Sequence, residues 1–451
     1  MENTDKTAQL GTEDISKLLI GYSLPAIAAQ IAASVYNVID SIFIGRGVGS
    51  MALTGLGITL PLMNLAAAFG ALVGAGGATL MSIKFGQKDR DGANKVLGNV
   101  VALNVFFGLG VMVFGLIFID KILYIFGASS QTLPYAKDFM TILLYANVFT
   151  HLYMGLNHAL RSCGYPRKAM FITMLTVGVN LVLAPLFIFV FKWGIKGAAL
   201  ATALAQVVAF VVLVAHFSNK KQPVKFVKKY FIPDYDIIKG IVSIGMSPFM
   251  MNICACLVVI IINNQLKTYG GDYAIGAYSI VNRVLMLFAM LVMGFNQGMQ
   301  PIAGYNFGAK LYDRVNQTLV QTIKYASAVM ITAFVICESV PQLVCSLFNT
   351  ETQLVDMSSH AMRIMVAAFP IVGFQMVTSN FFQCIGKAFI AVILSTTRQM
   401  LFLVPLLLML PSWFKLDGVW WALPISDGLS TFLAAYFLIR QFRIFKNSSI
   451  N

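Results

Sequence analysis

Apolar runs of about 20 residues recur along this chain from one end to the other, with short polar segments between them. A run of that length lets an α-helix cross the hydrocarbon core of a bilayer. Of the 451 residues, 58% are apolar and only 11% are charged, a balance that lies outside the range of soluble globular domains. The sequence therefore predicts an all-α integral membrane protein.

Turn signals between the apolar runs set the limits of twelve predicted membrane-spanning helices. These cover residues 15–44, 54–84, 95–119, 136–160, 168–191, 197–217, 236–266, 274–303, 316–338, 355–385, 388–411 and 418–440. The one long polar connection lies between the sixth and seventh predicted spans. We expect it to separate an N-terminal lobe, residues 1–217, from a C-terminal lobe, residues 236–451, with residues 218–235 as a linker.

The basic residues predict how the chain is oriented in the membrane. If the N-terminus is cytoplasmic, the predicted cytoplasmic segments hold 21 of the 32 Lys and Arg, whereas the outer loops hold six. Basic loops stay preferentially on the cytoplasmic side, so we expect both termini and the linker there. The polar N-terminal segment lacks the pattern of a removable signal peptide, and the first span is expected to serve for insertion.

Composition also argues against several classes of function. The net charge of +14 is spread over short loops rather than gathered on one folded face, so we expect no nucleic-acid partner. The six cysteines form no CxxC or Cys/His metal spacing, and His151 and His158 alone do not make a metal site. We expect no metal and no cofactor.

The two halves of the sequence repeat each other. The stretch "KFGQKDRDGANKVL" at 84–97 matches "NFGAKLYDRVNQTL" at 306–319, with Phe85 over Phe307 and Gly86 over Gly308. Nearly the same shift pairs Pro25 with Pro248. Because an even number of predicted spans separates the copies, both halves run the same way through the membrane, as in transporters built from parallel repeats.

At this point the residues resemble a known family. The resemblance rests on "SLP" at 23–25, "MSP" at 246–248, "NVIDSIFIG" at 37–45, "LRSCGYPRKAM" at 160–170, "KGAALATALAQ" at 196–206 and "QGMQPIAGYNFGAK" at 297–310. Together these are similar to the multidrug and toxic compound extrusion (MATE) family, nearest to its bacterial MepA-like branch. The resemblance implies two six-helix bundles related by a pseudo-twofold axis around a central cavity.

The resemblance also implies a function. It suggests a multi-pass antiporter of the bacterial cytoplasmic (inner) membrane, expected to be a monomer and not an enzyme. Its expected substrates are cationic, amphipathic small molecules, exported by alternating access in exchange for protons or sodium ions. A lipid-linked oligosaccharide flippase of the same superfamily and, with less support, an integral membrane enzyme are the alternatives.

Asp40 is the strongest candidate for the coupling residue. Of the 18 Asp and Glu, fifteen fall in loops or near span ends, which leaves Asp40, Glu338 and Asp427. Glu338 is the last residue of the ninth predicted span, so an interfacial role is expected for it. Placing an acidic side chain inside a membrane span costs free energy, so such a residue is a candidate for a functional role. A polar stripe on the same helix, formed by Gln30, Ser34, Asn37 and Ser41 with Tyr36 at its edge, predicts that Asp40 faces the lobe interior. The alternative is a hydrated or Arg-paired residue at the outer interface.

The resemblance implies partners for Asp40. Family members surround this aspartate with an Asn, a second Asp and a Thr, which match Asn180, Ala184 and Thr202 here. Because Ala184 replaces the second acid, the sequence favours proton coupling, with Asn180 and Thr202 bonding the protonated Asp40 side chain.

Other polar and flexible residues are candidates for further roles. Gln30, Ser34, Tyr36, Asn37, Met286, Met290 and Gln297 are predicted to line the substrate cavity, although packing or lipid contact also explains the methionines. Asp427 and Arg283 are candidates for a second site, with helix packing as the alternative for Asp427. Pro25 and Pro248 are predicted hinges, with static kinks as the alternative.

Overall fold

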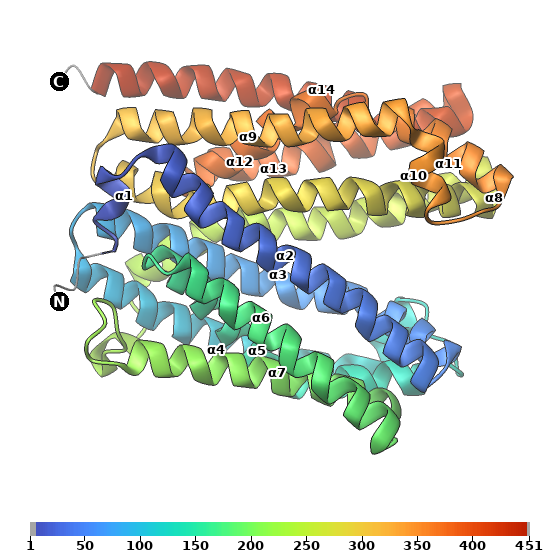
Figure 1. Ribbon diagram of the computed structural model, residues 1–451, viewed down its shortest axis with the longest axis horizontal. Coiled ribbons are helices and arrows are strands. Elements are labelled where there is room, and N and C mark those ends of the chain that lie inside the picture. Colours follow the sequence, from blue (N-terminus) through green and yellow to red (C-terminus); the bar gives the residue numbers. More distant parts are fainter. Residues whose placement is uncertain (1–5, 449–451) are drawn as a thin grey trace. The chain divides into compact units, whose positions relative to one another are not determined.

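The computed structural model describes residues 6–448, and every regular element in that range is helical (Figure 1). The elements are α1 (Gln9–Thr12), α2 (Ile15–Gly47), α3 (Ser50–Gly86), α4 (Arg90–Ile125), α5 (Leu133–Ser162), α6 (Pro166–Pro185), η1 (Leu186–Val190), α7 (Gly194–Ser218), η2 (Lys228–Phe231), α8 (Tyr235–Gly308), α9 (Tyr312–Ser339), α10 (Pro341–Ser346), α11 (Thr352–Val366), α12 (Phe369–Cys384), α13 (Ala388–Thr396), η3 (Thr397–Leu403) and α14 (Val404–Ser448).

The long helices match the twelve predicted spans once their internal breaks are counted. Helix α8, with 74 residues, is broken at Gly271, where φ is 66°, and α14 is broken at Lys415, where φ is 51°. Helices α11 and α12 together form one span bent by 55°. Within residues 6–448 these breaks convert the long apolar helices into twelve passes, which confirms the predicted all-α, multi-span class.

The chain forms two compact units that do not coincide with its two halves. One unit holds the described residues up to Thr12 together with Ala28–Phe249. The other holds Glu13–Ile27 and the described residues from Met250 onward. The divisions fall inside α2 and α8, two residues after Pro25 and one residue after Pro248. The predicted lobe limits at 217 and 236 stay a prediction.

Glycines allow the exchanged helix segments to pack closely within each unit. In the first unit, a Cβ on Gly245 of α8 would lie 1.8 Å from the carbonyl oxygen of Leu72 in α3. In the second unit, a Cβ on Gly298 would lie 2.1 Å from the Oγ atom of Ser23 in α2. Only a residue without a side chain lets these backbones approach so nearly.

The linker is ordered against the start of α4. The Oδ1 atoms of Asn94 and Asn99 accept hydrogen bonds from the backbone N–H groups of Lys225 and Asp234, both at 2.9 Å. The Tyr230 hydroxyl, in the short helix η2, donates to the carboxylate of Asp91. These three hydrogen bonds hold the linker to α4.

Candidate functional site

Asp40 lies in α2 and is buried, with 8% of its surface exposed. Its Oδ1 atom makes no hydrogen bond to any residue in the described part of the chain. Arg46, the nearest basic residue in sequence beyond it, is exposed. Burial agrees with the predicted inward-facing stripe rather than with a hydrated residue paired to Arg46.

Three polar side chains from three helices meet beside Asp40. The Asn180 amide of α6 donates to the Tyr36 hydroxyl oxygen of α2 at 3.0 Å and to the Thr202 hydroxyl oxygen of α7 at 2.9 Å. The Tyr36 and Thr202 oxygens lie 3.1 Å apart, within hydrogen-bonding distance. Tyr36 also interacts electrostatically with Asp40, which follows it by one helical turn. We call Tyr36, Asn180 and Thr202 the polar triad.

In this structure Asn180 and Thr202 bond Tyr36 and each other. Their expected bonds to a protonated Asp40 stay a prediction. The hydroxyl of Thr202 also lies 3.2 Å from the carbonyl oxygen of Ala198, one turn earlier in α7. The physical reason is reach, because the Tyr36 ring extends far enough across the helix interface to satisfy the amide of Asn180.

Ala184 is fully buried one turn after Asn180 in α6. It belongs to an apolar cluster that includes Phe187, Ile188 and Ile44. The position where the family resemblance implies a second acid is therefore part of a hydrophobic core in this chain.

The predicted cavity residues fall in both units and differ in exposure. In the first unit Gln30 and Ser34 are half-buried and Asn37 is exposed. In the second unit Met290 and Gln297 are half-buried, whereas Met286 is 55% exposed. Their assignment to a substrate cavity stays a prediction.

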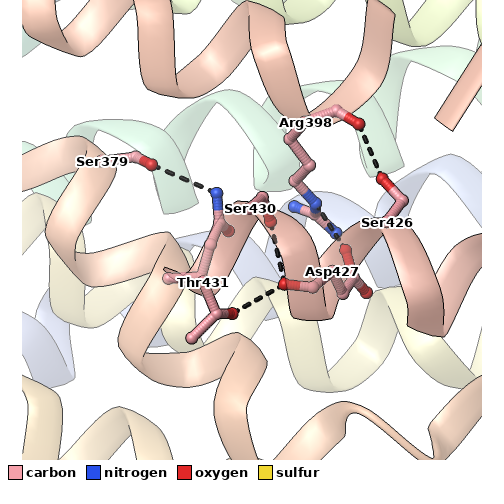
Figure 2. Close-up of polar contacts among 7 residues, drawn as sticks. Ser379, Arg398, Ser426, Asp427, Ser430 and Thr431 are labelled. Atoms are coloured by element: carbon pink, nitrogen blue, oxygen red, sulfur yellow. Dashed lines mark hydrogen bonds and ion pairs between the residues drawn. The ribbon is translucent and has the colours of Figure 1, made fainter. Parts of the chain in front are cut away.

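The second unit contains an ion pair between two adjacent spans. The Nε atom of Arg398, in η3, donates to Oδ1 of Asp427, in α14, at 2.7 Å (Figure 2). Arg283 is exposed in α8, so the structure gives Asp427 a different basic partner from the one considered in the sequence analysis. Within residues 6–448, no group of three or more His, Cys, Asp or Glu is arranged to hold a metal ion.

Comparison with known proteins decides the family. The MatE family model matches residues 25–186 and 246–409, which together cover most of the chain and fall one in each half. The chain belongs to the MATE family. It is a membrane transporter and not an enzyme.

Curated relatives of this MATE transporter include proteins from staphylococci. The multidrug export protein MepA of Staphylococcus haemolyticus is 29% identical over 427 residues, which is 94% of this chain and 93% of that protein. The protein of the same name from Staphylococcus aureus strain N315 is 26% identical over 95% of this chain and 94% of that protein.

Solved structures share the fold of this MATE transporter. A crystal structure of a MATE protein in the bent conformation has a TM-score of 0.94 at 23% identity and covers 100% of both chains. An outward-facing multidrug resistance MATE transporter of the MOP superfamily has a TM-score of 0.92 at 23% identity, covering 99% of this chain and 100% of that chain. These likenesses confirm the predicted MATE fold.

Sequence reasoning did not single out Arg398. The signal was present, because Arg398 lies well inside the eleventh predicted span and a guanidinium group in an apolar run needs an acidic or carbonyl partner.

Proposed function

We propose that this MATE-family chain exports cationic amphipathic compounds across the cytoplasmic membrane of a bacterium in exchange for protons. The observation that carries the proposal is Asp40, a buried carboxylate whose Oδ1 atom makes no hydrogen bond within residues 6–448. A carboxylate inside a bilayer needs a proton or a cation to neutralise it. Asp40 therefore binds either a proton or the positive group of a substrate.

Two observations support this choice of substrate and coupling ion. The relatives are named multidrug export proteins, and a lone acid suits compounds that combine positive charge with apolar area. Sodium binding needs several oxygen ligands that include charge, whereas a proton needs only one carboxylate. Ala184, in the apolar cluster, supplies no second carboxylate, so proton coupling is favoured.

The mechanism follows from competition for one carboxylate. Ionised Asp40 attracts a cationic substrate while the protein is open to the cytoplasm. When the protein is open to the outside, a proton neutralises Asp40 and the substrate is released. The polar triad positions α2, α6 and α7 around Asp40 through the bonds of Asn180 to Tyr36 and Thr202.

Pro25 and Pro248 are proposed hinges for alternating access. Each stands directly before the point where its helix passes from one compact unit to the other. Proline removes one intrahelical hydrogen bond, so bending there is easier. We expect Pro25→Ala to slow export, and Pro61→Ala, inside α3 and away from the unit boundaries, to leave it nearly unchanged. Equal export rates for the wild type, Pro25→Ala and Pro61→Ala would contradict the proposed hinge at Pro25.

The decisive experiment is transport in proteoliposomes with the proton and sodium gradients imposed separately. Export of a fluorescent organic cation such as ethidium should follow the proton gradient, and Asp40→Asn should abolish it without lowering the unfolding temperature. Asp272→Asn, at an exposed position of α8, is the matched control and should transport normally. Transport that follows sodium at fixed pH, or survives Asp40→Asn, would contradict the proposal. Complementation of a polysaccharide flippase mutant without drug resistance would favour the flippase.

The proposed orientation is tested separately. We propose that both termini and the linker are cytoplasmic, because the basic residues concentrate there. In a cysteine-free protein, a cysteine at Lys221 should resist an impermeant thiol reagent in intact cells, whereas one at Lys267, in a predicted outer loop, should react. The reverse pattern would overturn the topology.

A further inference from the structure

The ion pair between Arg398 and Asp427 lies deep in the second unit. Arg398 is near the middle of the eleventh predicted span and Asp427 near the middle of the twelfth. The side chain of Asp427 is 11% exposed and that of Arg398 is 31% exposed. Figure 2 shows the two side chains pointing toward one another from η3 and α14. Both residues lie away from the ends of their predicted spans, where a charged group needs a partner.

The pair leaves most of the guanidinium group unused. Its one hydrogen bond runs from Nε of Arg398 to Oδ1 of Asp427. Among residues 6–448, the two terminal nitrogens of Arg398 have no hydrogen-bond partner. An arginine that serves only to join two helices normally uses its planar fork for two parallel bonds to the carboxylate. Here the fork stays available to another acceptor.

The neighbouring hydroxyl groups do not neutralise the pair. Ser426 donates to the backbone carbonyl of Arg398 at 2.7 Å, and Ser430 and Thr431 donate to the carbonyl of Asp427 at 2.9 and 2.7 Å (Figure 2). These bonds fix the backbone on both sides of the pair. They leave the terminal nitrogens of Arg398 to be satisfied by something other than the described protein.

The local backbone is also irregular. Arg398 is the second residue of η3, a π-helical stretch from Thr397 to Leu403 inside an otherwise α-helical span. Such π-helical insertions occur mostly at functional sites because they re-aim a side chain at the expense of helix regularity. In the first unit, α6 and α7 are joined by the uncharged contact between Asn180 and Thr202 and, near the start of α6, by a contact between Lys168 and His216.

We propose that Arg398 is a substrate-binding residue that takes the carboxylate of an amphipathic organic acid or zwitterion, with Asp427 as its positioning residue. The Asp427 carboxylate accepts from Nε and orients the guanidinium plane, and the two terminal nitrogens of Arg398 donate two charge-assisted hydrogen bonds to the carboxylate of the substrate. This inference rests on the proposed export function and deepens it by assigning the residue that recognises a carboxylate on the substrate.

A matched pair of ligands tests the proposal. The probes are a zwitterionic fluoroquinolone, whose own fluorescence reports binding, and its methyl ester, which keeps the positive charge and lacks the carboxylate. Purified protein in nanodiscs should bind the zwitterion more tightly than the ester. Arg398→Gln should weaken binding of the zwitterion by about tenfold or more and leave the ester unchanged. Arg363→Gln, an exposed arginine of α11, is the matched control and should change neither.

Asp427→Asn distinguishes an Arg398 that binds substrate from an ion pair that only joins two helices. The Asn side chain keeps an amide oxygen that can accept the bond from Nε, so the guanidinium plane stays oriented, but it lacks the negative charge that competes with the substrate carboxylate for Arg398. The affinity ratio of zwitterion to ester should therefore rise. If the ion pair only joins the helices, the affinity ratio should not rise. If Arg398→Gln fails to fold because Asp427 is left buried and unpaired, the double variant Arg398→Gln/Asp427→Asn removes both charges and should lose the preference for the zwitterion.

Two outcomes overturn the inference: an affinity ratio unaffected by Arg398→Gln or the double variant, and an unchanged or lower ratio in Asp427→Asn. The export proposal fails by a different measurement: ethidium transport that does not follow the proton gradient, or that does not depend on Asp40. A protein that exports ethidium through Asp40 but shows no carboxylate preference would refute only the role of Arg398.

Discussion

The amide nitrogen of Asn180 lies 3.0 Å from the phenol oxygen of Tyr36, a residue 144 positions earlier in the chain. This bond joins α6 to α2 at the turn that precedes Asp40. Thr202 of α7 completes the contact, so the three helices around the buried carboxylate are held by side chains that carry no charge. The geometry of Asp40 therefore depends on groups whose hydrogen bonding does not change with pH in the physiological range.

Tyr36→Phe removes the hydroxyl that contacts Asn180 and Thr202, and it should lower proton-driven export by about tenfold, because each hydrogen bond contributes about 0.5–1.5 kcal/mol. Asn180 keeps its bond to Thr202, so the protein should still fold. The matched control is Tyr153→Phe, which removes the hydroxyl that bonds Thr173 at 3.2 Å elsewhere in the first unit. Transport assays in proteoliposomes compare the two, and an equal loss in both variants would argue against a special role for Tyr36.

Ala184→Asp should make export respond to a sodium gradient, because it places a second carboxylate one turn after Asn180. Ala184→Asn has nearly the same shape without the charge and should not produce the response. Both variants disturb an apolar cluster, so their unfolding temperatures should fall together. Sodium dependence in neither variant, in proteins that remain folded, would show that a second acid at this position is insufficient.

Gly298→Ala should destabilise the protein by about 1–3 kcal/mol through overpacking. The added Cβ would lie 2.1 Å from Oγ and 2.9 Å from the backbone nitrogen of Ser23, which belongs to the rigid helix α2. At Gly21, also in α2, no described atom lies within 4 Å of such a Cβ. Gly21→Ala should therefore be neutral or slightly stabilising, since alanine favours a helix. Unfolding temperatures in detergent check the contrast.

Asp89 gives a pH-dependent prediction outside the membrane spans. A hydrogen bond from the backbone N–H of Gly92, at 2.7 Å, and one from Lys84, at 3.0 Å, hold the pKa of the Asp89 carboxyl below its usual value of 3.8. Because the folded state prefers the ionised form, this contribution is complete above the ordinary pKa and is lost as pH falls through the lowered pKa.

Asp89→Ala should therefore lower stability by about 1 kcal/mol at pH 7, mainly by removing the cap of α4. The side chain is 40% exposed, so its charge contributes little beyond the cap. The difference from wild type should persist at pH 5 and shrink only below the ordinary pKa of the carboxyl. Thermal unfolding at several pH values measures it, and a difference that disappears already near pH 6 would point to another titrating group.

The sequence predicted the spans well because the physical requirement for them is simple. A bilayer-crossing helix needs a long apolar run, and the run 15–44 corresponds to α2 at Ile15–Gly47. The 55° bend between α11 and α12 was not predicted, although the sequence carries a signal for it. Pro370 lies in the first turn of α12, and a proline lacks the N–H that would continue the preceding helix and disfavours helical backbone in the residue before it.

The candidate site was predicted only in part. The burial of Asp40 follows from the helical spacing of its polar neighbours, which is local information. The bond from Asn180 to Tyr36 and the pairing of Arg398 with Asp427 depend on which helices are adjacent in space. Spacing along one helix does not contain that information, so these contacts required the structure.

The exchange of helix segments between the compact units has a consequence for biosynthesis. The first unit includes the start of α8, up to Phe249, so it cannot be completed when the ribosome has made only the first six spans. Ser23 and Ile27 are inserted near the beginning of translation, yet the glycines that they pack against, Gly298 and Gly294, emerge much later. The earliest span of this protein therefore waits in the membrane for its final neighbours, and a nascent chain released at the linker would leave that surface available to chaperones and membrane proteases.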